Sequence, residues 1–169
     1  MPDAITLKTR PSEGRLPWRR LAPRPYALMG EMEIYFAACD LEPSLIELVK
    51  MRASQINGCA YCIDLHSKDA RAAGESEQRL YALNAWRETA LYSERERAAL
   101  AWTESVTNIT DGHAPDEAYD AVRRHFGEAE LTQLTWVIAV INAWNRLAIG
   151  FRLPIDDRRS ANSPADTFC

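Results

Sequence analysis

The sequence predicts an all-α protein, a single-domain helical bundle of about seven helices. Apolar residues recur at helical spacing along most of the chain, and helix-capping or helix-stopping residues separate these stretches. No stretch shows the alternation of apolar and polar residues that is typical of a strand. With 169 residues, of which 47% are hydrophobic and 26% charged, the chain can bury one core. We expect a basic arm at 1–25, a helical domain at 26–153 and a flexible tail at 154–169.

Three helices are predicted in the first half of the domain. The first covers residues 26–39, where one stripe of side chains is apolar. The second begins at Pro43, because proline is accepted in a first helical turn, and ends at Asn57. Gly58 follows, and both Asn and Gly tolerate the left-handed backbone of a helix C-cap. The third helix covers about residues 59–73 and is closed by Gly74.

Capping residues divide the second half of the domain. Ser76 and Ser93 are placed as N-caps, and Glu96 completes a capping box that opens a helix to about residue 108. Further helices are expected at 115–126 and at about 130–149, each followed by a glycine. The short sequences "NAWR" and "NAWNR" resemble each other, and we interpret their tryptophans, Trp86 and Trp144, as packing anchors.

Charge and hydropathy exclude several functions. The formal net charge of −4 does not favour nucleic-acid binding, although residues 8–24 are rich in arginine. Such a run either contacts an acidic surface, is solvated, or wraps a partner subunit. The first twenty residues have no apolar leader, and the most apolar stretch, 134–149, is too short for a bilayer. We therefore expect a cytoplasmic protein without membrane contact, in which a close cysteine pair is catalytic, redox-sensing or metal-binding.

The sequence "INGCAYCIDLH", residues 56–66, carries the main functional signal. If Cys59 begins a helix, Cys62 lies one turn further and His66 about one more, so that the three share a face. The positive end of the helix dipole favours an anion, and cysteines at this position commonly have pKa values of about 3.5–7.5. At least one of the two sulfurs is therefore expected to be a reactive thiolate at neutral pH.

An acidic partner for the histidine stands upstream. Glu47 precedes the Asn57-Gly58 turn by about ten residues and His66 follows it by eight, so a helical hairpin brings both to nearly the same depth. The carboxylate then orients the imidazole, which takes a proton from a nearby thiol. The alternative is that Glu47 is only a solvated residue beside Lys50.

The spacing of Glu47, Cys59, Cys62 and His66 resembles the core motif of the alkylhydroperoxidase D-like (AhpD-like) proteins of the carboxymuconolactone decarboxylase superfamily, peroxidase-related branch. The likeness covers roughly residues 26–153, including "KMRASQINGCAYCIDLHSKDARAAG" and "INAWNRLAIGFR". It implies a helical subunit assembled into trimers or hexamers and a thiol-dependent peroxidase that needs no cofactor or metal. By this resemblance Cys62 attacks the peroxide, Cys59 resolves the sulfenic acid, and His66 and Glu47 relay the proton. An unidentified thiol reductant or adaptor protein restores the thiols.

One position departs from the family pattern, since Tyr61 stands where some members have a histidine. A tyrosine donates a hydrogen bond but is no base near neutral pH. Three other functions stay open: a metal site on the same four residues, decarboxylase or lactone chemistry, and a redox sensor without turnover. We expect Cys39 to be a buried small hydrophobe, and Cys169 and His113 to have no role.

Overall fold

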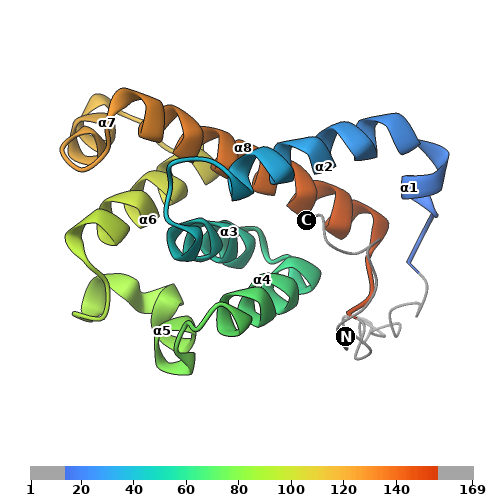
Figure 1. The fold of residues 1–169 in the computed structure, drawn as a ribbon, viewed down its shortest axis with the longest axis horizontal. Helices are drawn as coiled ribbons and strands as arrows, with labels where there is room; N and C mark the ends of the chain where they lie inside the picture. The colour runs from blue at the N-terminus through green and yellow to red at the C-terminus, as the bar shows by residue number, and fades with distance from the viewer. Residues whose placement is uncertain (1–13, 156–169) are drawn as a thin grey trace, which may run out of the picture.

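The computed structural model describes residues 14–155, and within that range the chain consists of helices joined by turns and loops (Figure 1). The all-α prediction is confirmed. The described range contains eight α-helices and one 3-10 helix: α1 (Trp18–Leu21), α2 (Pro23–Ala37), α3 (Pro43–Asn57), α4 (Ala60–Ala72), α5 (Glu77–Ala82), η1 (Leu83–Glu88), α6 (Glu94–Thr107), α7 (Asp116–Arg123) and α8 (Glu128–Phe151).

The helices are arranged around α3 (Figure 1). The longest helix, α8, runs across the molecule, with α2 beside it, and both lie on one side of α3. From the end of α3 the chain turns back into α4, and these two helices form an antiparallel hairpin. Because α3 packs against α4, α6 and α8, the helix that carries Glu47 lies at the centre of the fold.

The two faces of α3 are buried in different apolar clusters. One face joins the main core, in which residues of α8 such as Leu134, Ile138 and Ile141 are fully buried. The other face contributes to a second cluster formed with α4, α5, η1 and α6: Leu48, Met51, Ala70, Leu80, Leu83, Trp86, Tyr92 and Leu100. Burial of both faces fixes the position of α3, and hence of the predicted site.

Local signals placed the helix ends closely. The predicted helix Pro43–Asn57 is found with these bounds, and Cys59 is the N-cap of the next helix. Ser76 accepts a hydrogen bond from the backbone of Arg79, and Ser93 forms the predicted capping box. Helices α1 and η1 were not predicted, because each is short and is held by one buried tryptophan rather than by a periodic pattern.

The described part of the predicted arm, residues 14–25, lies against the domain. Trp18 is 9% exposed and its ring packs on those of Tyr26, Trp144 and Phe151. The predicted domain boundary at 25/26 falls inside α2. Residues 1–13 and 156–169, which include most of the predicted tail and Cys169, lie outside the described residues.

By length and composition α8 could cross a membrane, but half of its most apolar window is buried inside the protein. That burial is typical of a core helix. Cys39, which was expected to be buried, is only half-buried because it lies in the turn after α2, and His113 is exposed.

Candidate active site

The predicted hairpin turn is formed by a left-handed glycine. Gly58 has φ +68° and ends α3, and its N–H donates to the carbonyl of Gln55 at 3.2 Å. The N–H of Cys59 donates to the carbonyl of Ser54 at 2.9 Å, which satisfies a second terminal carbonyl of α3. Chain reversal therefore takes a single residue, and the first cysteine falls at the N-cap of α4.

Cys59 and Cys62 lie together at the N-terminus of α4 and form a disulfide, with their Cα atoms 5.4 Å apart. The backbone N–H of Cys62 points at the Cys59 sulfur, at 3.3 Å. Both residues are buried, with 1% and 0% exposure. An N–H group at a helix N-terminus stabilises a thiolate once the pair is reduced.

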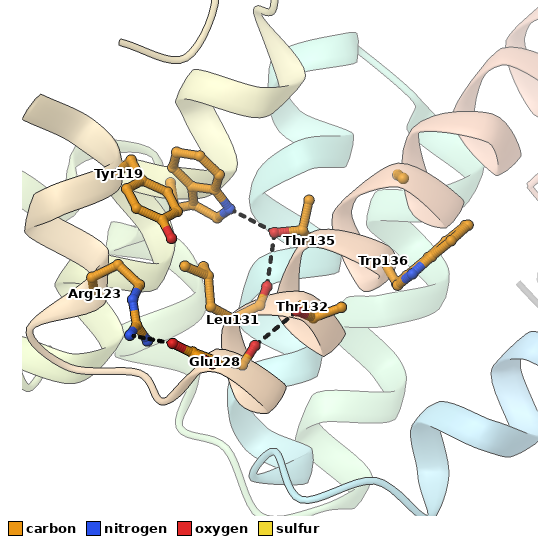
Figure 2. Close-up of a pocket in the computed structure, with 9 residues that line it drawn as sticks. Tyr119, Arg123, Glu128, Leu131, Thr132, Thr135 and Trp136 are labelled. Carbon is orange, nitrogen blue, oxygen red and sulfur yellow. Dashed lines mark hydrogen bonds and ion pairs between the residues drawn. The ribbon is translucent and has the colours of Figure 1, made fainter. Parts of the chain in front are cut away.

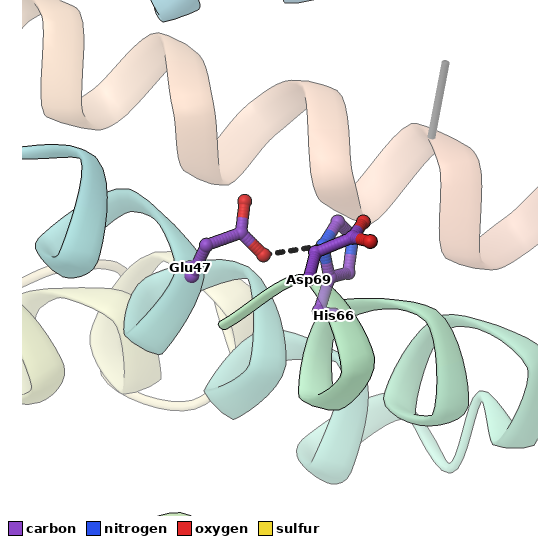
Figure 3. Close-up of side chains that lie close together, drawn as sticks. All are labelled: Glu47, His66 and Asp69. Carbon is purple, nitrogen blue, oxygen red and sulfur yellow. Dashed lines mark hydrogen bonds and ion pairs between the residues drawn. The ribbon is translucent and has the colours of Figure 1, made fainter. Parts of the chain in front are cut away.

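Glu47 and His66 meet across the hairpin (Figure 3). Oε2 of Glu47 lies 2.9 Å from Nδ1 of His66, which is 1% exposed. Burial by itself raises the pKa of the Glu47 carboxyl. The hydrogen bond and charge of His66, with the charge of Lys50, outweigh burial and hold this pKa below its ordinary value of 4.5. The carboxylate is therefore ionised at neutral pH.

An ionised carboxylate can only accept hydrogen bonds, so the shared proton belongs to Nδ1 of His66. In the neutral imidazole that carries its proton on Nδ1, the second ring nitrogen, Nε2, has a free lone pair and can act as a base. It is buried and has no hydrogen-bond partner within the described residues. Because His66 follows Cys62 by one turn of α4, the imidazole and the thiol share a helix face.

Asp69 also lies at this site, although it was not among the site residues predicted from the sequence. One ligand atom from each of Glu47, His66 and Asp69 lies within 4.8 Å of the others (Figure 3). Asp69 follows His66 by three residues on α4, so helical spacing could have revealed it. One imidazole and two carboxylates suit a divalent cation, whereas disulfide-bonded cysteines supply no thiolate ligand. The predicted metal alternative that used both cysteines therefore does not fit this oxidised form.

A buried ion pair lies close to Glu47, between α3 and α2. Nζ of Lys50, one turn along α3, donates to Oε2 of Glu33 on α2 at 2.5 Å, and both side chains are less than 10% exposed. Trp144 of α8 donates its indole N–H to the other oxygen of Glu33 at 2.9 Å. Lys50 is therefore held in place, and its positive charge, one turn from Glu47, lowers the pKa of that carboxyl.

Asparagines attach the turn of the hairpin to α8. The side-chain amide of Asn57 donates to Asn142 at 2.9 Å and to Asn145 at 2.8 Å. Asn145, which is fully buried, donates in turn to the hydroxyl of Ser54 at 3.0 Å. The "NAWNR" sequence thus provides two polar contacts and one packing anchor, Trp144.

Two pockets of the surface lie away from this site. One pocket of about 470 Å³ between α6, α7 and α8 is lined by Tyr119, Arg123 and Trp136 among others (Figure 2). A second, of about 550 Å³, lies between α2 and α8 and also includes Trp136. Neither contains Glu47, His66 or a cysteine of the predicted site.

Comparisons with known proteins identify the family and the fold. A sequence profile described as "Carboxymuconolactone decarboxylase family" matches residues 22–105. The uncharacterized protein YdfG of Bacillus subtilis is 44% identical over 135 residues, which cover 80% of this chain and 92% of YdfG.

Two solved structures have a similar fold. A protein of unknown function from Agrobacterium tumefaciens, described as a candidate antioxidant defence protein AhpD, has 40% identity and a TM-score of 0.81. The match covers 85% of this chain and all of that one. The debrominase Bmp8 has 22% identity and a TM-score of 0.74, over 82% of this chain and 74% of its own, and shows a shared fold. This chain therefore belongs to the carboxymuconolactone decarboxylase family and has the AhpD-like helical fold.

Proposed function

We propose that this protein is a thiol-dependent peroxidase that reduces hydroperoxides through a Cys59–Cys62 thiol/disulfide cycle. The observation that carries the proposal is the contact between Glu47 and His66 beside a cysteine pair at a helix N-terminus. Nucleophile, base and orienting carboxylate are the three parts of an activated-thiol site.

The reaction is written for the reduced protein. Nε2 of His66 takes the proton of the Cys62 thiol, and Glu47 stabilises the imidazolium that results. The thiolate attacks one peroxide oxygen, the O–O bond breaks, and the alkoxide leaves with the proton from His66 as an alcohol. Cys62 is now a sulfenic acid.

The second thiol completes the cycle. The Cys59 thiolate attacks the sulfur of the sulfenic acid, the S–O bond breaks and hydroxide leaves as water after protonation. The product is the disulfide between residues 59 and 62, which has received two oxidising equivalents from the peroxide. A thiol reductant, free or carried by an adaptor protein, returns two electrons.

Stopped-flow measurement of reduced protein against hydrogen peroxide and an organic hydroperoxide tests the proposal. We expect peroxide loss to match the loss of two thiols per chain, counted by thiol titration before and after. Cys39→Ser should react like wild type, because this half-buried cysteine lies outside the site. Loss of peroxide without loss of thiols would contradict the mechanism.

Burial of both sulfurs favours a second candidate function, a redox sensor whose disulfide forms but does not turn over. Steady-state peroxide consumption with excess dithiothreitol separates the two functions. A peroxidase consumes many equivalents of peroxide per chain, whereas a sensor stops after one.

The proposal extends to assembly and location. We propose a homo-oligomer, a trimer or hexamer, because large apolar side chains are exposed along α2 and α8, including Leu28, Tyr35 and Trp136 at 52–55%. Sedimentation velocity tests this, and Trp136→Ser should weaken the assembly. We place the protein in the cytoplasm, where reduced thiols are available to restore the cysteine pair.

A further inference from the structure

The disulfide cannot be reached from solvent in this structure. Cys59 and Cys62 are buried together against Ala148 of α8, and Tyr61 and Leu153 pack on the same cluster. Thiol–disulfide exchange requires a thiolate to contact a sulfur. Part of the covering layer therefore has to move before any reductant can react.

The cover is formed where the two ends of the described chain meet. The N–H of Arg15 donates to the carbonyl of Phe151 at 2.8 Å, and its guanidinium donates to that of Gly150 at 3.0 Å. The Trp18 ring stacks on Phe151 at 5.8 Å. Leu153, two residues further on, packs on the cluster of Cys59, Cys62 and Ala148. Residues 14–19 thus hold the segment that covers the disulfide.

A hydrogen bond joins residues 14–19 to the tyrosine between the cysteines. Nη2 of Arg19 donates to the Tyr61 hydroxyl at 3.4 Å, while its guanidinium lies 5.5 Å and 5.3 Å from the ring centres of Trp18 and Tyr26. A hydrogen bond of that length is weak. Local opening where residues 14–19 meet the end of α8 requires less free energy than global unfolding.

The cover is strongly basic although the whole chain has a net charge of −4. Residues 14–25 and 150–155 contain five arginines and neither Asp nor Glu: Arg15, Arg19, Arg20, Arg24 and Arg152. All of these except Arg19 are exposed. On α4 the nearby acid Asp64 is ion-paired with Lys68 at 2.7 Å. Positive charges near a site raise the encounter rate of anions.

We propose that the cover selects the reductant, so that the disulfide is reduced by an anionic thiol that approaches along the arginines and enters when Arg19 releases Tyr61. This inference rests on the proposed function, because it names the class of reductant for that cycle. The negative charge is carried either by a small thiol or by acidic residues around the thiol of a protein.

The exchange balances as two displacements. The first thiolate attacks one sulfur of the disulfide, forms a mixed disulfide and releases the other protein sulfur as a thiolate. A second thiolate then attacks the mixed disulfide and releases the remaining protein sulfur. The reductant leaves as its own disulfide, two electrons pass to the protein, and two protons from solvent complete the thiols.

Three thiols of similar size and different charge provide the test: 3-mercaptopropionate, 2-mercaptoethanol and cysteamine. Each rate of reduction of the oxidised protein is divided by the rate of the same thiol with an uncharged small disulfide. We expect the corrected rate of the anion to exceed that of the cation about tenfold at low salt and about twofold in 0.5 M NaCl. Equal corrected rates would overturn the proposal.

Variants separate charge from opening. Arg20→Glu and Arg24→Glu together should reduce the preference for the anion to about twofold. Tyr61→Phe, which removes the hydroxyl that Arg19 contacts, should speed all three thiols by about the same factor of three to five. Tyr81→Phe is the matched control, since Tyr81 is 76% exposed and its hydroxyl contacts Glu77 on its own helix. An unchanged rate in Tyr61→Phe would contradict the opening step.

Short peptides distinguish the two sources of charge. If a peptide with an aspartate-flanked cysteine reduces the disulfide faster than 3-mercaptopropionate, the reductant is an acidic protein. If this peptide and 3-mercaptopropionate have the same corrected rate, the reductant is a small thiol. Both results support the proposal. Faster reduction by a lysine-flanked cysteine would refute it.

No peroxide enters these assays, so a protein without peroxidase activity still gives a result. In parallel, the reduced protein is alkylated with iodoacetate, which is an anion, and with iodoacetamide, which is neutral. The ratio of the two rates, divided by the same ratio for free cysteine, should favour iodoacetate.

Discussion

The two ends of the proposed proton relay have different surroundings. At the sulfur end Cys62 and His66 are 0% and 1% exposed, and Cys62 lies beneath the cover formed where residues 14–19 meet the end of α8. At the carboxylate end the Glu47 side chain is 19% exposed, and Asp69 beside it lies at the surface. A proton taken from the thiol can therefore reach solvent through Glu47 while the cover is closed. In the proposed cycle, peroxide and reductant would reach the sulfur only when the cover opens.

Removal of the sulfur end should have the largest effect. We expect Cys62→Ser to lose peroxide consumption completely, because a serine hydroxyl is not ionised at neutral pH and cannot replace the thiolate. Stopped-flow peroxide assays measure this, with Cys39→Ser as the control. Cys59→Ser should still consume one equivalent and stop at the sulfenic acid, which dimedone labelling followed by mass spectrometry detects. Full turnover by Cys62→Ser would refute the assignment.

The sulfur end was predicted from sequence because its contacts are local. A glycine turn, an N-cap cysteine and a histidine about two turns later are all set by spacing along one segment. The contact between Glu47 and His66 also followed from helical rise, because the depth of a residue on either helix of the hairpin is counted from the same turn.

The surroundings of both ends could not be predicted in the same way. Glu33 reaches Lys50 from another helix, and Arg19 reaches Tyr61 from the N-terminal segment. Neither pair has a fixed spacing, and a buried Lys50 resembles a surface lysine in sequence. Such contacts depend on how helices pack rather than on local propensity.

The carboxylate end is tested by Glu47→Gln. The amide keeps the shape of the side chain but loses the charge that orients His66 and stabilises the imidazolium. We expect peroxide consumption to slow by about 100-fold, within the range for loss of a general acid–base component. The pH dependence of Cys62 alkylation should shift as well, and Asp69→Asn should change both by less than about threefold. Wild-type rates in Glu47→Gln would show that this end is not used.

Lys50→Met tests the buried charge next to the carboxylate end. It leaves the Glu33 carboxylate buried with only the indole of Trp144 as a partner. Since breaking a buried ion pair is costly, we expect a loss of about 3 kcal/mol in the free energy of unfolding. Urea denaturation at pH 7 measures it. The double variant Glu33→Gln/Lys50→Met should be the more stable of the two, and equal stability would contradict this account.

Gly58→Ala tests the turn that brings the two ends together. An added Cβ meets no atom within 4 Å, so the cost comes from the backbone, whose φ of +68° is unfavourable for alanine. We expect a loss of about 1 kcal/mol. Gly150→Ala is the matched control, because it lies within α8, has equal space and should not destabilise. Equal changes in the two variants would show that the left-handed turn is not the cause.

The pH dependence of folding should show the smallest effect, and its sign follows from Glu47. Its pKa is lower in the folded protein than in the unfolded chain, so the folded state binds the carboxyl proton less readily. The stability that this provides is complete above the unfolded pKa of about 4.5 and is lost as the pH falls through the lower folded pKa. In Glu47→Gln the free energy of unfolding should therefore decline less steeply in acid than in wild type, as measured by urea denaturation from pH 7 to pH 3. An identical decline in both proteins would mean that the contact with His66 does not persist in solution, and the comparison between a shielded sulfur end and a solvent-connected carboxylate end would then fail.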